Sequence, residues 1–406
     1  MTRLTITRLG ARGDGIASDN GTTVHVPFAL PGEEVEIEPL SERIRTVLVR
    51  SPERITPFCP HFGSCGGCKM QHLAPAPYAA WKRGMLEEVL ARAGIATEIA
   101  PLVAAQGVGR RRVTLHVRFE KGRALAGLMA AKSHDLIDLD RCPVLVPGLD
   151  RAADIARAVM APLARLNKTA DVQVTASLGG LDVDIRGPGK LEMPLRLALT
   201  EVAERLDLAR LSLHGEMIVE RRSPALRMGK ALVVPPAGGF LQATEAGETT
   251  LAGLVAEAVG KARRIADLFC GAGPFALRLA GEHAVDGFDS DKPAIEALTR
   301  AARATPGLKP LKAEARDLFR RPLLAHELKS YDAVVLDPPR AGAEAQVRQI
   351  ALAKAPARIV YASCDPQSFA RDAASLIAAG YRLERVTPVD QFAFTTHLEM
   401  VGVFSR

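Results

Sequence analysis

The stretch "DLFCGAGPF", Asp267–Phe275, joins the end of an apolar run to two glycines and the start of a helical pattern. It predicts a strand, a sharp turn and a helix. Gly271 and Gly273 let the backbone turn and let a ligand approach, and the helix N-terminus offers free N–H groups. From residue 238 to 406 strand and helix patterns alternate, which indicates an α/β doubly wound sheet with an antiparallel strand pair at its end.

Two acidic residues end later predicted strands at the same edge of this sheet. Asp289 lies 22 positions after Asp267 (267 to 289), where a carboxylate can accept both hydroxyls of a ribose. Asp337 ends the strand in "VVLDPPR". A dinucleotide would prefer a third glycine where this chain has Pro274, so we favour S-adenosylmethionine and a Rossmann-like, seven-stranded class I methyltransferase fold over a dehydrogenase. Cys270 is expected to be a packing residue.

A thiol and a carboxyl are the candidate reactive groups. Arg340 follows "DPP" where amino-group methyltransferases place an aromatic residue, which argues against an exocyclic nitrogen as the target. Carbon 5 of a pyrimidine is a poor nucleophile, and covalent addition of a thiolate at carbon 6 activates it. Cys364 in "VYASCDPQSF" and Glu399 in "THLEMVGVF" could serve as nucleophile and general base. Taken singly, Cys364 is more simply read as a packing residue and Glu399 as a surface acid at a strand end. Their joint occurrence behind this turn favours catalysis.

The motifs "GGFLQ", "DLFCGAGPF", "DPPRAG", "SCDP" and "HLEMV" occur in this order, and together they resemble the RNA uracil-5-methyltransferase family over essentially the whole chain. The resemblance implies Cys364 as nucleophile and Glu399 as base. It also implies cofactor contacts at Gln242, Phe269, Asp289, Asp317 and Asp337, which join Gly271 and Gly273 of the turn as candidate cofactor-binding residues. The chain departs from the family at Pro274 and at Ala393 and Phe394, in "QFAFTTHLE".

Four cysteines precede residue 150, namely Cys59, Cys65, Cys68 and Cys142. Their spacing accommodates either a structural zinc ion or an iron–sulfur cluster, since both accept four thiolates. Gly66 and Gly67 could turn N–H groups toward cluster sulfurs, which mildly favours the cluster. The resemblance covers "CPHFGSCGGCKMQH" and "DRCPVL", and it implies a [4Fe-4S] cluster that braces the structure without redox turnover.

Three domains are expected along the chain. Residues 1–52 read as short strands and resemble the small TRAM β-barrel that binds RNA, an OB-like module. Residues 53–237 form a mixed α/β central domain that carries the cysteine loop, and residues 238–406 form the catalytic domain. A target base in folded RNA must be unstacked and turned into the pocket, and three domains around one site could hold it open.

Charge and composition suit an RNA partner without proving one. The 406 residues include 53 Lys and Arg against 46 Asp and Glu, a net charge of +7. The clusters Arg110–Arg112 and Arg221–Arg222 could meet a polyanion or could be solvated faces. No apolar run is long enough to span a membrane and the start "MTRLTITRLG" has no signal-peptide centre, so a cytoplasmic protein without a membrane partner is expected. We expect a monomer.

The sequence therefore predicts an S-adenosylmethionine-dependent enzyme that makes 5-methyluridine in RNA. Ribosomal RNA, 23S above all, is favoured over transfer RNA because the chain keeps both the barrel and the four-cysteine loop. Three alternatives stay open: a transfer-RNA enzyme, a cytosine-5-methyltransferase, which would usually carry a cysteine after the proline of its "DPP"-like motif, and an iron–sulfur RNA-binding protein with an inactive methyltransferase domain.

Overall fold

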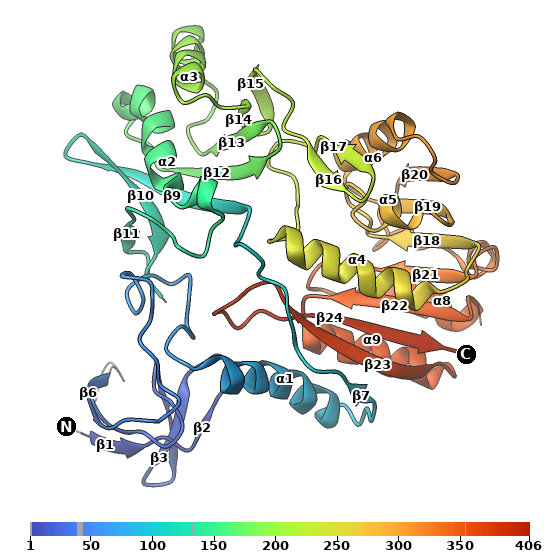
Figure 1. Ribbon diagram of the computed structural model, residues 1–406, viewed down its shortest axis with the longest axis horizontal. Coiled ribbons are helices and arrows are strands. Elements are labelled where there is room, and N and C mark those ends of the chain that lie inside the picture. The colour runs from blue at the N-terminus through green and yellow to red at the C-terminus, as the bar shows by residue number, and fades with distance from the viewer. Residues whose placement is uncertain (1, 39–43, 132, 354) are drawn as a thin grey trace.

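The computed structural model describes residues 2–38, 44–131, 133–353 and 355–406, and it shows three lobes (Figure 1). The N-terminal strands form the lower-left lobe, a sheet with two helices forms the upper-left lobe, and the large sheet lies on the right. The lobes follow one another in the order of the chain, but segments that adjoin one lobe in sequence can pack against another.

The N-terminal lobe consists of two three-stranded antiparallel sheets, with strand orders β1-β5-β6 and β2-β3-β4. Its apolar core includes Leu4, Ile6, Val26 and Val35, all nearly inaccessible to solvent. Residues 1 and 39–43 of the expected barrel lie outside the described residues. The strands are β1 (Thr2–Thr5), β2 (Arg8–Leu9), β3 (Gly15–Asp19), β4 (Thr22–Val26), β5 (Glu34–Ile37) and β6 (Ile44–Val49).

The central lobe is a seven-stranded sheet in the order β11-β10-β9-β12-β13-β14-β15, with helices packed on one face. Alternate residues of β9, such as Leu115 and Val117, point into this core, as a half-buried strand requires. The strands are β9 (Arg112–Glu120), β10 (Arg123–Met129), β11 (Leu136–Asp138), β12 (Ala170–Ser177), β13 (Gly180–Arg186), β14 (Arg210–Leu213) and β15 (Glu216–Glu220). The helices are η1 (Pro147–Leu149), α2 (Ala152–Met160), η2 (Ala161–Leu166) and α3 (Met193–Arg205).

The C-terminal lobe is built on a sheet with the order β20-β19-β18-β21-β22-β24-β23. All neighbours are parallel except β24, which runs antiparallel between β22 and β23. The central strands are buried on both faces and therefore read as continuous apolar runs; all four residues of β21 are buried. The strands are β18 (Arg264–Leu268), β19 (Ala284–Asp289), β20 (Leu311–Ala315), β21 (Ala333–Leu336), β22 (Arg358–Ser363), β23 (Arg382–Asp390) and β24 (Glu399–Ser405).

Helices cover both faces of this sheet, which confirms the expected doubly wound fold. One core lies beneath α4, α5 and α6, and the other beneath α7, α8 and α9. The helices are α4 (Glu245–Val259), α5 (Ala276–Leu279), α6 (Lys292–Ala304), α7 (Ala325–Leu328), α8 (Glu344–Ala353) and α9 (Pro366–Ala378).

Two segments that the sequence predicts to belong to the central domain pack against the catalytic sheet instead. The helix α1 (Pro75–Arg92) buries Leu86 and Leu90 in the catalytic core, and β7 (Glu98–Ile99) and β8 (Val103–Ala104) extend the sheet beyond β23. The hairpin of β16 (Leu226–Met228) and β17 (Ala231–Val233) packs on the opposite face. Sequence patterns mark the elements but not the partners against which they pack.

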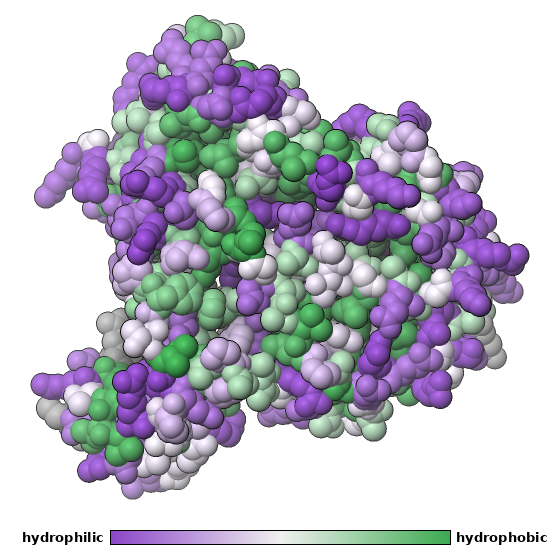
Figure 2. Space-filling model, in the orientation of Figure 1, coloured by the Kyte–Doolittle hydropathy of each residue, from purple (hydrophilic) through white to green (hydrophobic). Residues whose placement is uncertain are grey.

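The surface in Figure 2 is mostly polar, with small apolar areas between charged ones. The outline of the molecule in this view narrows between the N-terminal lobe and the central lobe. No helix among the described residues is both long and apolar enough to cross a membrane.

One buried ion pair joins α1 to the end of β23. The Lys82 side chain is fully buried and donates hydrogen bonds to Asp390 Oδ1 (2.6 Å) and to the carbonyl of His397 (2.5 Å). The Tyr78 hydroxyl donates to Asp390 Oδ2 (2.7 Å). Burial lowers the pKa of Lys82, and Asp390 opposes that shift. The pair therefore fixes the start and the end of the segment that connects β23 to β24.

We expect Lys82→Met to lower the free energy of unfolding by about 3–5 kcal/mol, because Asp390 would stay buried without its cationic partner. Urea denaturation followed by circular dichroism measures the change. On the same helix, Arg92 pairs with Glu88 at the surface, so Arg92→Ala is the control and should cost less than about 0.5 kcal/mol. Equal stabilities of the two variants would contradict the structural role given to Lys82.

Candidate active site

The turn after β18 leaves open space on the ligand-facing side. Phe269 and Gly271 both have left-handed backbone conformations, with φ of 64° and 51°. A Cβ on Gly271 would meet nothing within 4 Å, so the backbone is bare where a ligand would approach. The Gly271 N–H donates to Asp289 Oδ2 (2.9 Å), which ties the turn to the end of β19. The predicted cofactor residues Phe269, Gly271 and Asp289 are therefore brought together.

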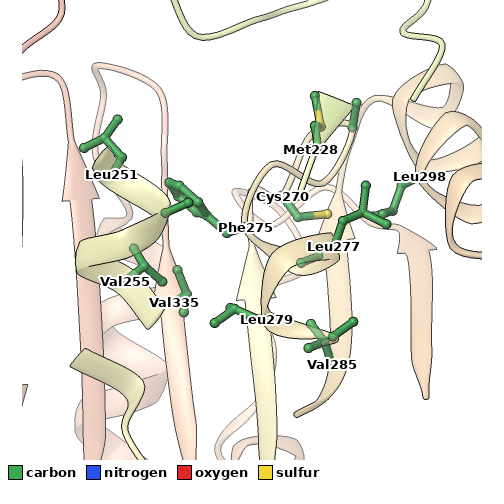
Figure 3. Packing of buried hydrophobic residues seen from close by; sticks show 14 of the residues in the cluster. Met228, Leu251, Val255, Cys270, Phe275, Leu277, Leu279, Val285, Leu298 and Val335 are labelled. Atoms are coloured by element: carbon green, nitrogen blue, oxygen red, sulfur yellow. The ribbon is translucent and has the colours of Figure 1, made fainter. Parts of the chain in front are cut away.

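Gly273 and Cys270 have packing roles in the same turn. A Cβ on Gly273 would lie 2.4 Å from Leu298 Cδ1, so this glycine is needed for contact with α6. Cys270 is 3% exposed and packs among apolar side chains beside Leu277 and Leu298 (Figure 3). The expectation that Cys270 is a packing residue is confirmed. The close contact with Leu298 explains the glycine at position 273 without any ligand.

A second aromatic ring stands opposite Phe269. Phe319 is 47% exposed, and its ring centroid lies 5.4 Å from that of Phe269. The predicted residue Asp317 accepts hydrogen bonds from the N–H groups of Phe319 and Arg320, so it shapes the turn that presents this ring. Sequence reasoning missed Phe319, although "DLF" occurs at both Asp267 and Asp317 and could have indicated it.

Carboxyl groups gather at this edge of the sheet. Asp267 is completely buried, and burial raises its pKa to about 8 against the opposing effect of the backbone N–H of Ala276. The pKa of Asp337 is raised well above its usual range, first by burial and then by Glu399, Asp267 and Asp289. Such a cluster attracts a cationic ligand, because adding positive charge relieves the repulsion among the carboxyl groups.

Cys364 and Glu399 are brought to one place by the antiparallel strand β24. Ser363, the last residue of β22, pairs with Met400, so continuing the register places Cys364 beside Glu399. Asp365 then caps α9 by accepting from the Ser368 N–H (2.8 Å), and Pro366 begins the helix. The expectation that the thiol sits at the carboxyl end of a strand agrees with this placement.

The protonation states of Cys364 and Glu399 are set by burial and by neighbouring charges. Glu399 is 4% exposed, and burial raises its pKa to about 7, against the opposing effects of Gln391, Arg340 and Lys82. Burial, followed by the charges of Glu399 and Asp337, raises the pKa of Cys364 to about 11, against the opposing effect of Arg340. Glu399 can therefore exchange a proton near neutral pH, whereas the thiol holds its proton in the free protein.

Gln242 lies between the two halves of this site. It is 4% exposed, its Nε2 is 3.5 Å from Asp337 Oδ2, and its Oε1 accepts a hydrogen bond from Gln391 (2.6 Å). Gln391 also donates to Glu399 Oε1 (3.2 Å). Sequence reasoning did not identify Gln391, because a glutamine after a strand has no spacing or composition that marks it.

The four early cysteines line one cavity of about 280 Å³, at the junction of their loop with the central sheet. Burial, and to a lesser extent the other three cysteines, raise the pKa of Cys142 to about 11. Gly67 donates its N–H to Cys65 Sγ (3.4 Å), as expected, whereas the Gly66 N–H donates to the carbonyl of Met129. Among the described residues, no group of three or more His, Cys, Asp and Glu is arranged to hold a metal ion.

The arginine clusters noted in the sequence are engaged within the protein. Arg111 is buried and pairs with Glu248, and Arg112 donates to Thr175 Oγ1 (2.9 Å). Arg221 and Arg222 both contact Asp207 (2.7 Å each). These contacts give the clusters structural roles at domain junctions and turns.

Comparisons with known proteins agree with this geometry. Residues 308–406 match the family model described as tRNA (Uracil-5-)-methyltransferase. An uncharacterized RNA methyltransferase of Brucella suis is 45% identical, covering 100% of this chain and 98% of that protein. The 23S rRNA (uracil(1939)-C(5))-methyltransferase RlmD of Chromohalobacter salexigens is 34% identical, and the match covers 99% of this chain and 89% of that protein.

A solved structure shares the fold over nearly the full length. It is the tRNA (uracil-54, C5)-methyltransferase of Pyrococcus abyssi in complex with S-adenosyl-L-homocysteine, with a TM-score of 0.75, 23% sequence identity and 99% coverage of both chains. The likeness in sequence to full-length relatives, together with the site at the carboxyl edge, confirms the resemblance expected from the motifs: the chain belongs to the RNA uracil-5-methyltransferase family.

Proposed function

We propose that this protein methylates carbon 5 of a uridine in RNA, with Cys364 as nucleophile and Glu399 as general base. The observation that carries the proposal is the placement of β24 between β22 and β23, which sets a carboxyl of pKa about 7 beside a strand-end thiol. A base that titrates near neutral pH suits the removal of a carbon-bound proton.

The residues support a covalent sequence of steps. The Cys364 thiol gives its proton to solvent and its sulfur bonds to carbon 6 of uracil, which moves the carbon 5–carbon 6 electron pair toward the carbonyl at carbon 4. That electron density at carbon 5 then takes the methyl group of the donor, and the electron pair of the broken sulfur–methyl bond stays on the donor's sulfur. Glu399 removes the carbon-5 proton, the double bond re-forms, and the bond between sulfur and carbon 6 breaks. Arg340 lies where it favours the thiolate.

S-adenosylmethionine is the proposed methyl donor, and when bound it supplies an electrophilic methyl group on a sulfonium. The site fits its chemistry in three respects. The carboxyl cluster that includes Asp337 favours a cation, the bare backbone at Gly271 admits a ligand, and the rings of Phe269 and Phe319 offer apolar faces to an adenine. Asp289 accepts one hydrogen bond on each oxygen, from the N–H groups of Gly271 and Asp291, and each oxygen retains acceptor capacity for a ribose hydroxyl.

A [4Fe-4S] cluster at Cys59, Cys65, Cys68 and Cys142 is part of the proposal. Its support is that all four thiols line one cavity and that Gly67 directs an N–H to a sulfur. A tetrahedral zinc site draws its thiolates to within about 4 Å of one another. A cavity of about 280 Å³ lined by all four thiols exceeds the room that a single ion needs.

Ribosomal RNA is the proposed substrate class. The relative from Chromohalobacter salexigens acts by its name on 23S rRNA, and it covers this chain almost fully. The barrel of residues 1–52 and the central domain would hold the RNA around the target base. The structure from Pyrococcus abyssi keeps transfer RNA as a second candidate.

Incubation with methyl-labelled S-adenosylmethionine and total RNA should place the label in 5-methyluridine, identified by nucleoside digestion and mass spectrometry. Separated ribosomal and transfer RNA, each lacking prior methylation, should show the label in the ribosomal fraction. Label in methylcytidine, or no label in any RNA, would contradict the proposed reaction.

The covalent step predicts different fates for two variants. With RNA carrying 5-fluorouridine, the wild-type protein should form an adduct that survives denaturing electrophoresis, because fluorine cannot leave as a proton. Cys364→Ala should form none, and Cys270→Ala should still form it because that thiol only packs. Glu399→Gln should accumulate an adduct even with ordinary uridine, since carbon 5 would keep its proton. An adduct in Cys364→Ala would show that another residue is the nucleophile.

Anaerobic purification should yield a brown protein with about four iron atoms per chain, measured together with acid-labile sulfide. Cys142→Ser should lose most of the iron, whereas Cys270→Ser, in a different domain, should keep it. A colourless protein that contains zinc would overturn the proposed cluster.

A further inference from the structure

Gln391 occupies the centre of the hydrogen-bonded groups beneath the active site. It is the first residue after β23 and is 1% exposed. Its Nε2 donates to Gln242 Oε1 (2.6 Å) and to Glu399 Oε1 (3.2 Å). One buried amide therefore joins the proposed base to the glutamine beside Asp337.

The orientation of this amide is set by the backbone. The N–H of Ala243 donates to Gln391 Oε1 (3.0 Å), so the oxygen faces Ala243 and the NH₂ group must face Gln242 and Glu399. Because Gln242 accepts with its oxygen, its own NH₂ group faces Asp337 Oδ2. A single backbone donor thus determines the direction of two side-chain amides.

The first turn of α4 is shaped around Gln391. A Cβ on Gly247 would lie 2.6 Å from Gln391 Cβ and 2.7 Å from Gln391 Oε1, so only glycine allows this approach. Thr244 caps the same turn by accepting from the Gly247 N–H (2.8 Å). The helix therefore approaches closely enough to restrict the movement of the amide.

The NH₂ group of Gln391 favours the ionised form of Glu399. A carboxylate accepts a hydrogen bond more strongly than a neutral acid does, so a fixed donor stabilises the form that can take a proton. Of the effects that oppose burial on the pKa of Glu399, this hydrogen bond is the largest, followed by Arg340 and Lys82. Asp337 and Cys364 are the other titratable groups that face it.

We propose that Gln391 is a positioning residue, whose amide keeps Glu399 ready to accept the carbon-5 proton and sets the direction in which Gln242 presents its NH₂ group. The inference rests on the proposed function, in which Glu399 is the base. It predicts that removing the NH₂ group of Gln391 slows catalysis mainly at the pH values at which Glu399 becomes protonated.

The test is the pH dependence of the single-turnover methylation rate in Gln391→Met. The rate rises with pH as Glu399 loses its proton, and without the donor this rise should move upward by about one pH unit. The variant should therefore be about tenfold slower than wild type near pH 6 and should approach the wild-type rate above pH 9. An equal loss of rate at every pH would overturn the proposal.

Gln346→Met is the matched control. Gln346 is a fully buried glutamine of the same domain, and its amide bonds the N–H and the carbonyl of Leu323 (2.8 and 3.1 Å), away from the site. This variant loses an equivalent buried amide and should leave the pH profile unmoved. A profile that shifts equally in both variants would also overturn the proposal.

Direct titration of Glu399 separates this inference from the proposed reaction, because it needs neither RNA nor turnover. Carboxyl ¹³C-labelled glutamate gives a signal for Glu399 that is assigned by its loss in Glu399→Gln. Its titration should move upward in Gln391→Met and in Gln391→Leu, a second uncharged variant without an NH₂ donor that guards against misfolding of the first. An unmoved titration overturns the role of Gln391, whereas a shifted titration in a protein that methylates no uridine refutes only the proposed reaction.

Discussion

The buried pair of Lys82 and Asp390 is the contact on which the rest of the site depends. Asp390 ends β23, and Lys82 also reaches the carbonyl of His397, so the eight residues of the connection, 391–398, are held at both ends. Glu399 follows directly. A buried lysine costs free energy unless it is paired, and here the pairing is combined with hydrogen bonds from Tyr78 and to the backbone. The proposed base is thereby positioned from a helix that lies more than 300 residues earlier in the chain.

The same connection is also contacted from the cysteine loop and from the segment that leads into the central sheet. Arg110 of the central segment reaches the carbonyl of Ala393 (3.5 Å), and Lys69 and Met70 of the cysteine loop donate their N–H groups to the carbonyl of Phe394. Phe394 takes a left-handed conformation with φ of 65°, which is costly for an aromatic residue and persists because these bonds hold it. A cluster bound beside Lys69 would therefore brace the active site through the backbone of this connection.

Sequence patterns predicted the local features of the site and missed those that depend on packing. The turn at Gly271, the acids at strand ends and Cys364 before a capping Asp-Pro all follow from local rules, and the structure brings them to one edge. Gln391 and Phe319 were missed, because their roles come from partners distant in sequence. The same reason explains why α1 and the β16–β17 hairpin were assigned to the central domain: their periodicity shows that one face is buried, but not against which sheet.

The charges around the site are separated in a way that suits two substrates of opposite sign. Asp267, Asp289 and Asp337 gather where the bare backbone of the turn lies, and their mutual repulsion favours a cation there. On the side of the β23–β24 connection, Arg340, Lys82, Arg110 and Lys69 all act on His397, whose pKa is lowered first by burial and then by these cations. Cys364 and Glu399 lie at the boundary, where a thiolate gains from Arg340 while the carboxyl keeps a pKa near neutral.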